Sequence, residues 1–261
     1  MAYYDFRKTG KIEKLDFEKF AIDFENPKEY GSGGIKEYKL TYDGEQVKFI
    51  SPAQKCWGLQ DAYGDDITKK NLTLLFPLDN SDEAIQSHLE TLQYLDEFVP
   101  RELKANMKKL FKSAVLKKVN ESDIDKGYSN ILRQMIDKET EEVSDTAPIM
   151  FRSRLVHVKD DEGNPTDDFY TKFYDHNKEE QKITKDSLPK NTEISVAYAL
   201  PGIWVKATAQ PGCGIVQRNH QMRAMAPVEK LGCVIDDTSS DEASDEENEA
   251  SSEEEGNDDL E

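Results

Sequence analysis

The spacing of apolar residues changes twice along the chain, and this double change limits the folds open to it. Apolar and polar side chains alternate over residues 35–50, and alternation returns after residue 148. Between them, over residues 81–118, apolar residues recur at helical spacing. A doubly wound α/β sheet needs strands and helices that alternate regularly, so the order predicts a mainly β fold with one helical insert.

The β segments are bounded by turn signals. Residues 35–42 and 45–50 flank Asp43-Gly44, a favoured two-residue hairpin turn, and residues 71–78 form a third predicted strand. Further strands are predicted over residues 149–159, 168–175, 193–199, 202–209 and 214–224, the last two as a hairpin. The first 30 residues show no clean period and are interpreted as an irregular arm. The pattern suits a small antiparallel barrel.

The helical segment is predicted as three pieces. Ser81 is a candidate N-cap for the first helix, and Pro100 is expected to interrupt it. A second helix is predicted over residues 103–116 and a third, weaker one over 123–136. We therefore expect a single domain over residues 1–235, with the helical insert at about residues 81–138.

The charge is concentrated at the C-terminal end. The chain has 53 acidic and 34 basic residues, and residues 236–261 contain 14 of the acidic residues and no Lys or Arg. Leu260 is the only large apolar residue in that tail, so we expect it to be disordered. A polyanionic tail can compete with nucleic acid for a basic groove or recruit basic partners, although it can also be merely solubilising. The candidate tail residues are Asp241, Glu242, Asp245, Glu246, Glu247, Glu253, Glu254 and Glu255.

Several classes of protein are disfavoured. No apolar run approaches the length of a transmembrane helix, and the first residues lack the apolar core of a signal peptide. The three cysteines are widely spaced, which argues against a disulfide framework or a zinc site and favours a reducing, intracellular compartment. There is no Gly-rich phosphate loop, nucleophile elbow or metal-binding His pair, so we expect neither an enzyme nor a cofactor.

Cations and aromatic residues on the predicted strands indicate nucleic-acid binding. Bases stack on aromatic rings while Lys and Arg follow the phosphates. Trp204 and Lys206 share one strand face, as do Arg152 and Arg154. The alternative is that the tryptophan belongs to the core and the cations lie on a solvated face. The candidate binding residues are Arg152, Arg154, Lys172, Tyr174, Trp204, Lys206 and Arg218.

A second basic cluster follows the interrupting proline. It could bind a nucleic-acid backbone, or it could be the solvated side of an amphipathic helix whose apolar side faces the core. Its members are Arg101, Lys104, Lys108, Lys109, Lys112, Lys117 and Lys118.

The C-terminal segments resemble a known family. The run from Pro148-Ile149-Met150-Phe151 to Val158, then Phe169 to Asp175, then Val196 to Leu200 leading into Gly202-Ile203-Trp204-Val205 is similar to the replication single-stranded-DNA-binding proteins of podophages and their counterparts in large eukaryotic DNA viruses. The likeness covers residues 148–223 and the acidic tail. The phage proteins finish with an aromatic residue, whereas this chain ends Leu260-Glu261.

The resemblance implies an OB-type barrel with a helical insertion and a protein that coats single-stranded DNA in replication and recombination. It also implies a tail that contacts polymerase or helicase and regulates dimerisation or DNA access, in the nucleus or a cytoplasmic virus factory. The rival hypotheses are a histone chaperone-like or assembly protein whose tail binds basic partners, and a structural virion protein. The residues do not decide between DNA and RNA.

Overall fold

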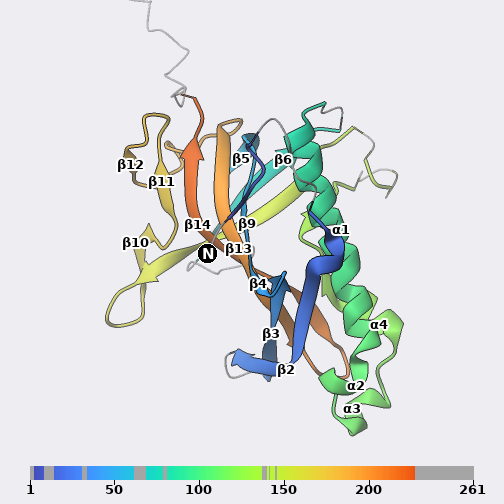
Figure 1. Ribbon diagram of the computed structural model, residues 1–261. Coiled ribbons are helices and arrows are strands. Elements are labelled where there is room, and N and C mark those ends of the chain that lie inside the picture. The colour runs from blue at the N-terminus through green and yellow to red at the C-terminus, as the bar shows by residue number, and fades with distance from the viewer. Residues whose placement is uncertain are drawn as a thin grey trace, which may run out of the picture. The chain divides into compact units, whose positions relative to one another are not determined.

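The computed structural model describes residues 3–8, 15–30, 34–61, 69–78, 81–136, 140, 142–144 and 146–226. The described part of the chain is mainly β with one helical insert, as the sequence predicts (Figure 1). The acidic tail, its boundary at residue 235 and Cys233 lie outside the described residues, so the predictions about them stay predictions.

The hairpin predicted at Asp43-Gly44 is confirmed. Strand β3 (Ile35–Tyr42) pairs antiparallel with β4 (Glu45–Ile50), and Asp43 and Gly44 have φ angles of 51° and 77°. Positive φ at both central residues is the geometry that an Asp-Gly turn supplies. The short strand β1 (Tyr4–Asp5) pairs parallel with β4.

The N-terminal segment is more regular than the sequence predicts. After a 3-10 turn, η1 (Phe17–Lys19), strand β2 (Phe20–Tyr30) pairs antiparallel with β3. The prediction of an irregular arm is therefore wrong for this stretch. The register shifts between Asp23 and Lys28, where the Asp23 carboxylate accepts hydrogen bonds from the backbone N–H groups of Glu25 and Asn26. This irregularity breaks the period of two, which explains why the sequence pattern hides the strand.

One long strand lies at the centre of the sheet. Strand β13 (Glu193–Lys206) pairs with β3, β4, β5 (Gln54–Asp61) and β14 (Gly212–Ala224). The separate strands predicted at 193–199 and 202–209 are therefore one, with a register shift between Ala199 and Gly202. A Cβ on Gly202 would lie 2.4 Å from the Tyr38 carbonyl oxygen, so this approach of β13 to β3 requires glycine.

A second set of strands follows β5. Strands β5, β6 (Lys69–Phe76) and β9 (Ile149–Lys159) are antiparallel neighbours, with Lys69 opposite Val156 and Phe76 opposite Ile149. The strand predicted at 168–175 breaks at Tyr170-Thr171. Its first part, β10 (Pro165–Phe169), pairs with β9, whereas β11 (Lys172–Tyr174) pairs with β14 and with β12 (Glu180–Gln181). The break lets the chain change neighbours.

Helix α1 (Glu83–Ala105) runs through Pro100 without interruption, which corrects the predicted break. Its buried stripe continues on both sides of Pro100, from Leu92 to Leu103, and this packing offsets the cost of about 3 kcal/mol for an interior proline. The cap is Asp82 rather than Ser81, because the Asp82 carboxylate accepts from the N–H groups of Ala84 and Ile85.

The remainder of the insert is short and compact. The helix predicted over 103–116 is divided among the end of α1, α2 (Met107–Leu110) and α3 (Ser113–Leu116). The helix predicted over 123–136 is α4 (Glu121–Gly127), followed by β7 (Tyr128–Ser129) and β8 (Leu132–Arg133). Strand β7 pairs with β14 and β8 pairs with β9, so tertiary pairing overrides the weak helical period.

Candidate nucleic-acid interface

A seam separates strands β9 and β14. No backbone ladder joins these two strands within the described residues. Side chains bridge them instead: Gln217 Nε2 donates to Ser153 Oγ at 3.2 Å, and Asn219 Nδ2 donates to Ser153 Oγ and, at 3.0 Å, to the Arg154 carbonyl. Side chains, rather than a backbone ladder, therefore join β9 to β14 along this stretch.

The segment 128–133 crosses this seam. Ser129 lies opposite Gly214 of β14 and Arg133 lies opposite Met150 of β9, so one short turn touches both edges. The turn comes from the helical insert, which thus contributes to the groove rather than lying apart from it.

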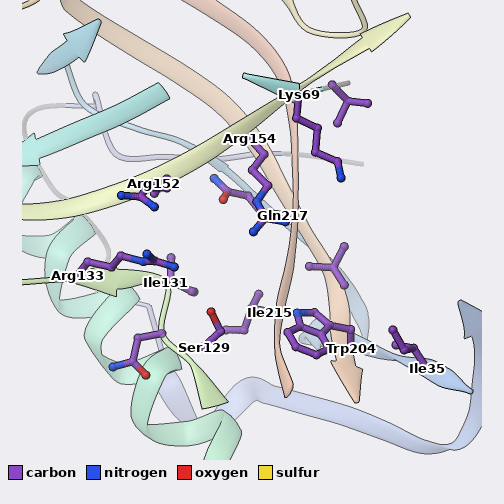
Figure 2. Close-up of a pocket in the computed structure, with 13 residues that line it drawn as sticks. Ile35, Lys69, Ser129, Ile131, Arg133, Arg152, Arg154, Trp204, Ile215 and Gln217 are labelled. Atoms are coloured by element: carbon purple, nitrogen blue, oxygen red, sulfur yellow. The ribbon is translucent and has the colours of Figure 1, made fainter. Parts of the chain in front are cut away.

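The resulting cavity is open and has a volume of about 420 Å³ (Figure 2). Four of its lining residues are cationic, and none of the described residues that line it is Asp or Glu. In Figure 2 the cations follow one margin of the cavity, while Trp204 lies across from them beside Ile35. The polar and aromatic residues that line it on the β strands include Lys69, Arg133, Arg152, Arg154, Trp204 and Gln217.

The strand register aligns the four cations. Arg152 and Arg154 are two residues apart on β9 and therefore share a face. Lys69 lies opposite Val156 and Arg133 opposite Met150, and these two β9 residues belong to the same alternating set. Directly opposed residues of antiparallel strands point to the same side, so all four cations project from one face of β6, β9 and β8.

Trp204 forms the opposing wall on β13. A Cβ on Gly214 would lie 3.0 Å from Trp204 Nε1, and one on Gly212 would lie 3.3 Å from Trp204 Cζ3. The indole therefore lies against β14 where two glycines leave room for it. The side chain is half-buried, so part of the ring remains accessible from the cavity. An accessible ring facing cations can stack a base while the phosphates meet Lys and Arg.

The structure brings only some of the predicted binding residues together. Arg152, Arg154 and Trp204 meet in the groove, although they lie on different walls rather than on one sheet face. Lys206 shares the face of Trp204 and lies opposite Ile35, at the margin of the groove. Arg218 lies outside the set of lining residues, with its guanidinium 3.8 Å from the Glu37 carboxylate.

Lys172 and Tyr174 lie on β11, which pairs with the C-terminal end of β14, opposite Gln221 and Arg223. Lys172 Nζ is 3.0 Å from the Glu180 carboxylate, and this hydrogen bond raises the pKa of the lysine. Neither residue lines the groove. Their role in binding stays a prediction.

Sequence reasoning missed three groove residues, Lys69, Arg133 and Gln217. Lys69 lies just before the strand predicted at 71–78, and Arg133 lies in a stretch predicted as helix. Pairing β6 with β9 in register would have placed Lys69 beside the arginines. No local signal identifies Arg133, because its strand exists only through its pairing with β9.

The second basic cluster carries ion pairs. Lys104 Nζ lies 2.6 Å from the Asp125 carboxylate, and Lys109 Nζ lies 2.6 Å from that of Glu25. These contacts fit a solvated helical surface better than a nucleic-acid site, because carboxylates there would repel phosphates.

Two further findings concern sites of other kinds. In the part of the chain that the structure describes, no group of three or more His, Cys, Asp or Glu side chains could hold a metal ion. The described helices include none long and apolar enough to cross a membrane.

Among solved structures, the chain is similar to the single-stranded DNA-binding protein from bacteriophage Enc34, with 15% identity, coverage of 84% of this chain and 98% of that chain, and a TM-score of 0.37. The Enc34 protein in complex with ssDNA is 14% identical, with coverage of 79% of this chain and 97% of that chain and a TM-score of 0.37. The third similar structure is gp2.5, a single-stranded DNA binding protein encoded by bacteriophage T7. It is 11% identical, with coverage of 69% of this chain and 86% of that chain and a TM-score of 0.34. No protein-family model and no curated protein sequence matches the chain. The resemblance to phage proteins noted from the sequence is thus confirmed as structural similarity.

Proposed function

We propose that the chain binds single-stranded DNA in the groove between β9 and β14. The observation that carries the proposal is the composition of that groove: four cations on one wall, a half-buried tryptophan on the other, and no carboxylate among its described lining residues. The proposal rests on this groove alone.

The groove suits a single strand for two physical reasons. The cations can neutralise phosphates, which releases counterions and favours binding at low salt. The indole offers a flat face for an unpaired base, and such stacking contributes about 1–3 kcal/mol per base and tolerates any sequence. A base inside a duplex is already stacked and cannot use the ring.

The finer parts of the proposal concern the fold and the tail. We infer an OB-like barrel in which side chains and the segment 128–133, rather than a ladder, close the seam. We infer that the protein coats single-stranded DNA in viral replication or recombination. The tail residues 236–261 would compete with DNA for the groove and recruit a polymerase or helicase, and the protein could form a homodimer. A matched charge pattern supports the competition, because the tail is anionic and the groove cationic.

The direct test is fluorescence anisotropy with a labelled oligo-dT strand, comparing the full chain with residues 1–235. We expect salt-sensitive binding that strengthens when the tail is removed. Replacing Arg154, Trp204 and Lys206 together by Ala should abolish most of it. The matched control replaces Lys117 and Lys118, which are exposed in the second basic cluster, and should leave affinity within about twofold.

Failure would take a distinct form for each part. Binding that is unchanged by tail removal would contradict the competition while leaving the groove intact. No binding by either form would contradict the function, and it would favour a chaperone or virion protein whose tail binds basic partners. Equal affinity of an oligo-U strand would extend the ligand to RNA.

A further inference from the structure

Asp96 is a half-buried carboxylate on helix α1 that does not itself line the groove. It accepts hydrogen bonds from the Tyr128 hydroxyl at 2.9 Å, the Ile131 N–H at 2.8 Å and the Leu132 N–H at 2.9 Å. All three donors belong to the segment 128–133. One side chain thus holds both strands of the turn and the loop between them.

Burying the Asp96 carboxylate costs free energy unless hydrogen-bond donors surround it. Burial raises the pKa of Asp96, while the bonds from Leu132, Ile131 and Tyr128 oppose that shift by stabilising the charged form. A carboxylate in such a place needs its donors, and donors to a charged acceptor form stronger bonds than neutral pairs. Two of the three donors are backbone groups, so the contact fixes the path of the chain itself.

The path matters because the segment forms part of the groove. Ser129, Asn130, Ile131 and Arg133 line the cavity. Each strand of the turn has only two residues, and such short pairings are weak on their own. The position of Arg133 relative to Arg152 and Arg154 therefore depends on an additional anchor.

We propose that Asp96 is a positioning residue for DNA binding: helix α1 holds the segment 128–133 across the seam through Asp96 and thereby sets Arg133 among the groove cations. This inference rests on the proposed function and deepens it. It assigns the helical insert a role in shaping the groove, and Asp96 itself touches no DNA.

The test combines two readouts on the full chain. The first needs no DNA: hydrogen exchange of the peptide that contains Ile131 and Leu132 should accelerate in Asp96→Ala, while peptides from β13 should not change. The second is oligo-dT affinity, which should fall about tenfold in Asp96→Ala and less in Asp96→Asn, which keeps one acceptor oxygen. Glu97→Gln removes an exposed charge from the next residue of the same helix and should bind like wild type.

A double-mutant cycle separates positioning from general destabilisation. Arg133→Ala should weaken binding in the wild-type background but have little effect when Asp96 is already Ala. Arg154→Ala should weaken binding equally in both backgrounds, because β9 holds Arg154 through its pairing with β6. If Asp96→Ala does not fold, Tyr128→Phe replaces it: this change removes one of the three bonds and should show the same coupling at smaller size.

The outcomes distinguish failure of the positioning role of Asp96 from failure of the proposed DNA binding. Equal effects of Arg133→Ala in both backgrounds, or exchange that rises equally in β13, would overturn the positioning role. Failure of the wild-type chain to bind oligo-dT would overturn the proposed function and this inference with it. Wild-type binding that is unchanged by Asp96→Ala would overturn the inference alone.

Discussion

Acidification should destabilise the fold through one buried histidine. His88 of α1 is fully buried among aromatic rings, with Nε2 2.6 Å from the Tyr198 hydroxyl and Nδ1 3.3 Å from Gln54 Oε1. Since an amide oxygen only accepts, Nδ1 carries the proton and Nε2 accepts from the tyrosine. Both nitrogens of the neutral ring have partners, and because the ring is fully buried, the charge added by a second proton would be kept from water.

The size of the effect follows from the pKa. Desolvation lowers the pKa of His88 to about 3, whereas an unfolded histidine titrates near 6.5. Between these values the unfolded chain binds a proton that the folded chain does not, so stability is complete above the unfolded pKa and is lost as the pH falls. Linkage gives a loss of about 2 kcal/mol on going from about pH 7.5 to about pH 5.

The assay is urea unfolding followed by circular dichroism at both pH values, for the wild type and for His88→Gln. Glutamine can still bond with Tyr198 but does not titrate. The variant should therefore lose less stability than the wild type on acidification, by about 2 kcal/mol, whatever its stability at neutral pH. Equal losses in the two proteins would refute the assignment of a buried, neutral histidine.

Three other changes bear on the groove and the tail. Trp204→Ala should weaken oligo-dT binding by about 1–3 kcal/mol and Trp204→Phe by less, measured by anisotropy; equal binding by all three proteins would exclude stacking on this ring. Gly214→Val should displace the indole, since a Cβ there would lie 3.0 Å from Trp204 Nε1, and should change both tryptophan fluorescence and affinity. Deleting residues 236–261 should raise affinity most at low salt, where the attraction between tail and groove is least screened.

The parts of the fold that depend on local signals could be predicted from the sequence. The Asp43-Gly44 hairpin and the β13–β14 hairpin follow from turn residues flanked by alternating side chains. Strand β2 could not be predicted, because a bulge breaks its alternation. Helix α1 passes through Pro100 because burial of the apolar side chains along the helix outweighs the local cost of an interior proline. That burial depends on the tertiary structure, so the sequence alone predicts a break at the proline.

The candidate site was only partly predictable for a related reason. Arg152 and Arg154 lie on one strand, so alternation alone places them together. These arginines line the same cavity as Trp204 only because β9 and β14 lie side by side at the seam. No local sequence pattern predicts that arrangement. Arg133 depends on an anchor 37 residues earlier in the chain, Asp96.

The most direct test of the account is the salt dependence of oligo-dT affinity for the wild type and for the double variant Arg152→Ala, Arg154→Ala. Each phosphate neutralised adds about −0.7 to the slope of log affinity against log salt, so the double variant should give a slope shallower by about 1.4. The control, Lys117→Ala with Lys118→Ala, should keep the wild-type slope. An unchanged slope in the arginine variant would contradict the claim that this groove carries the phosphates.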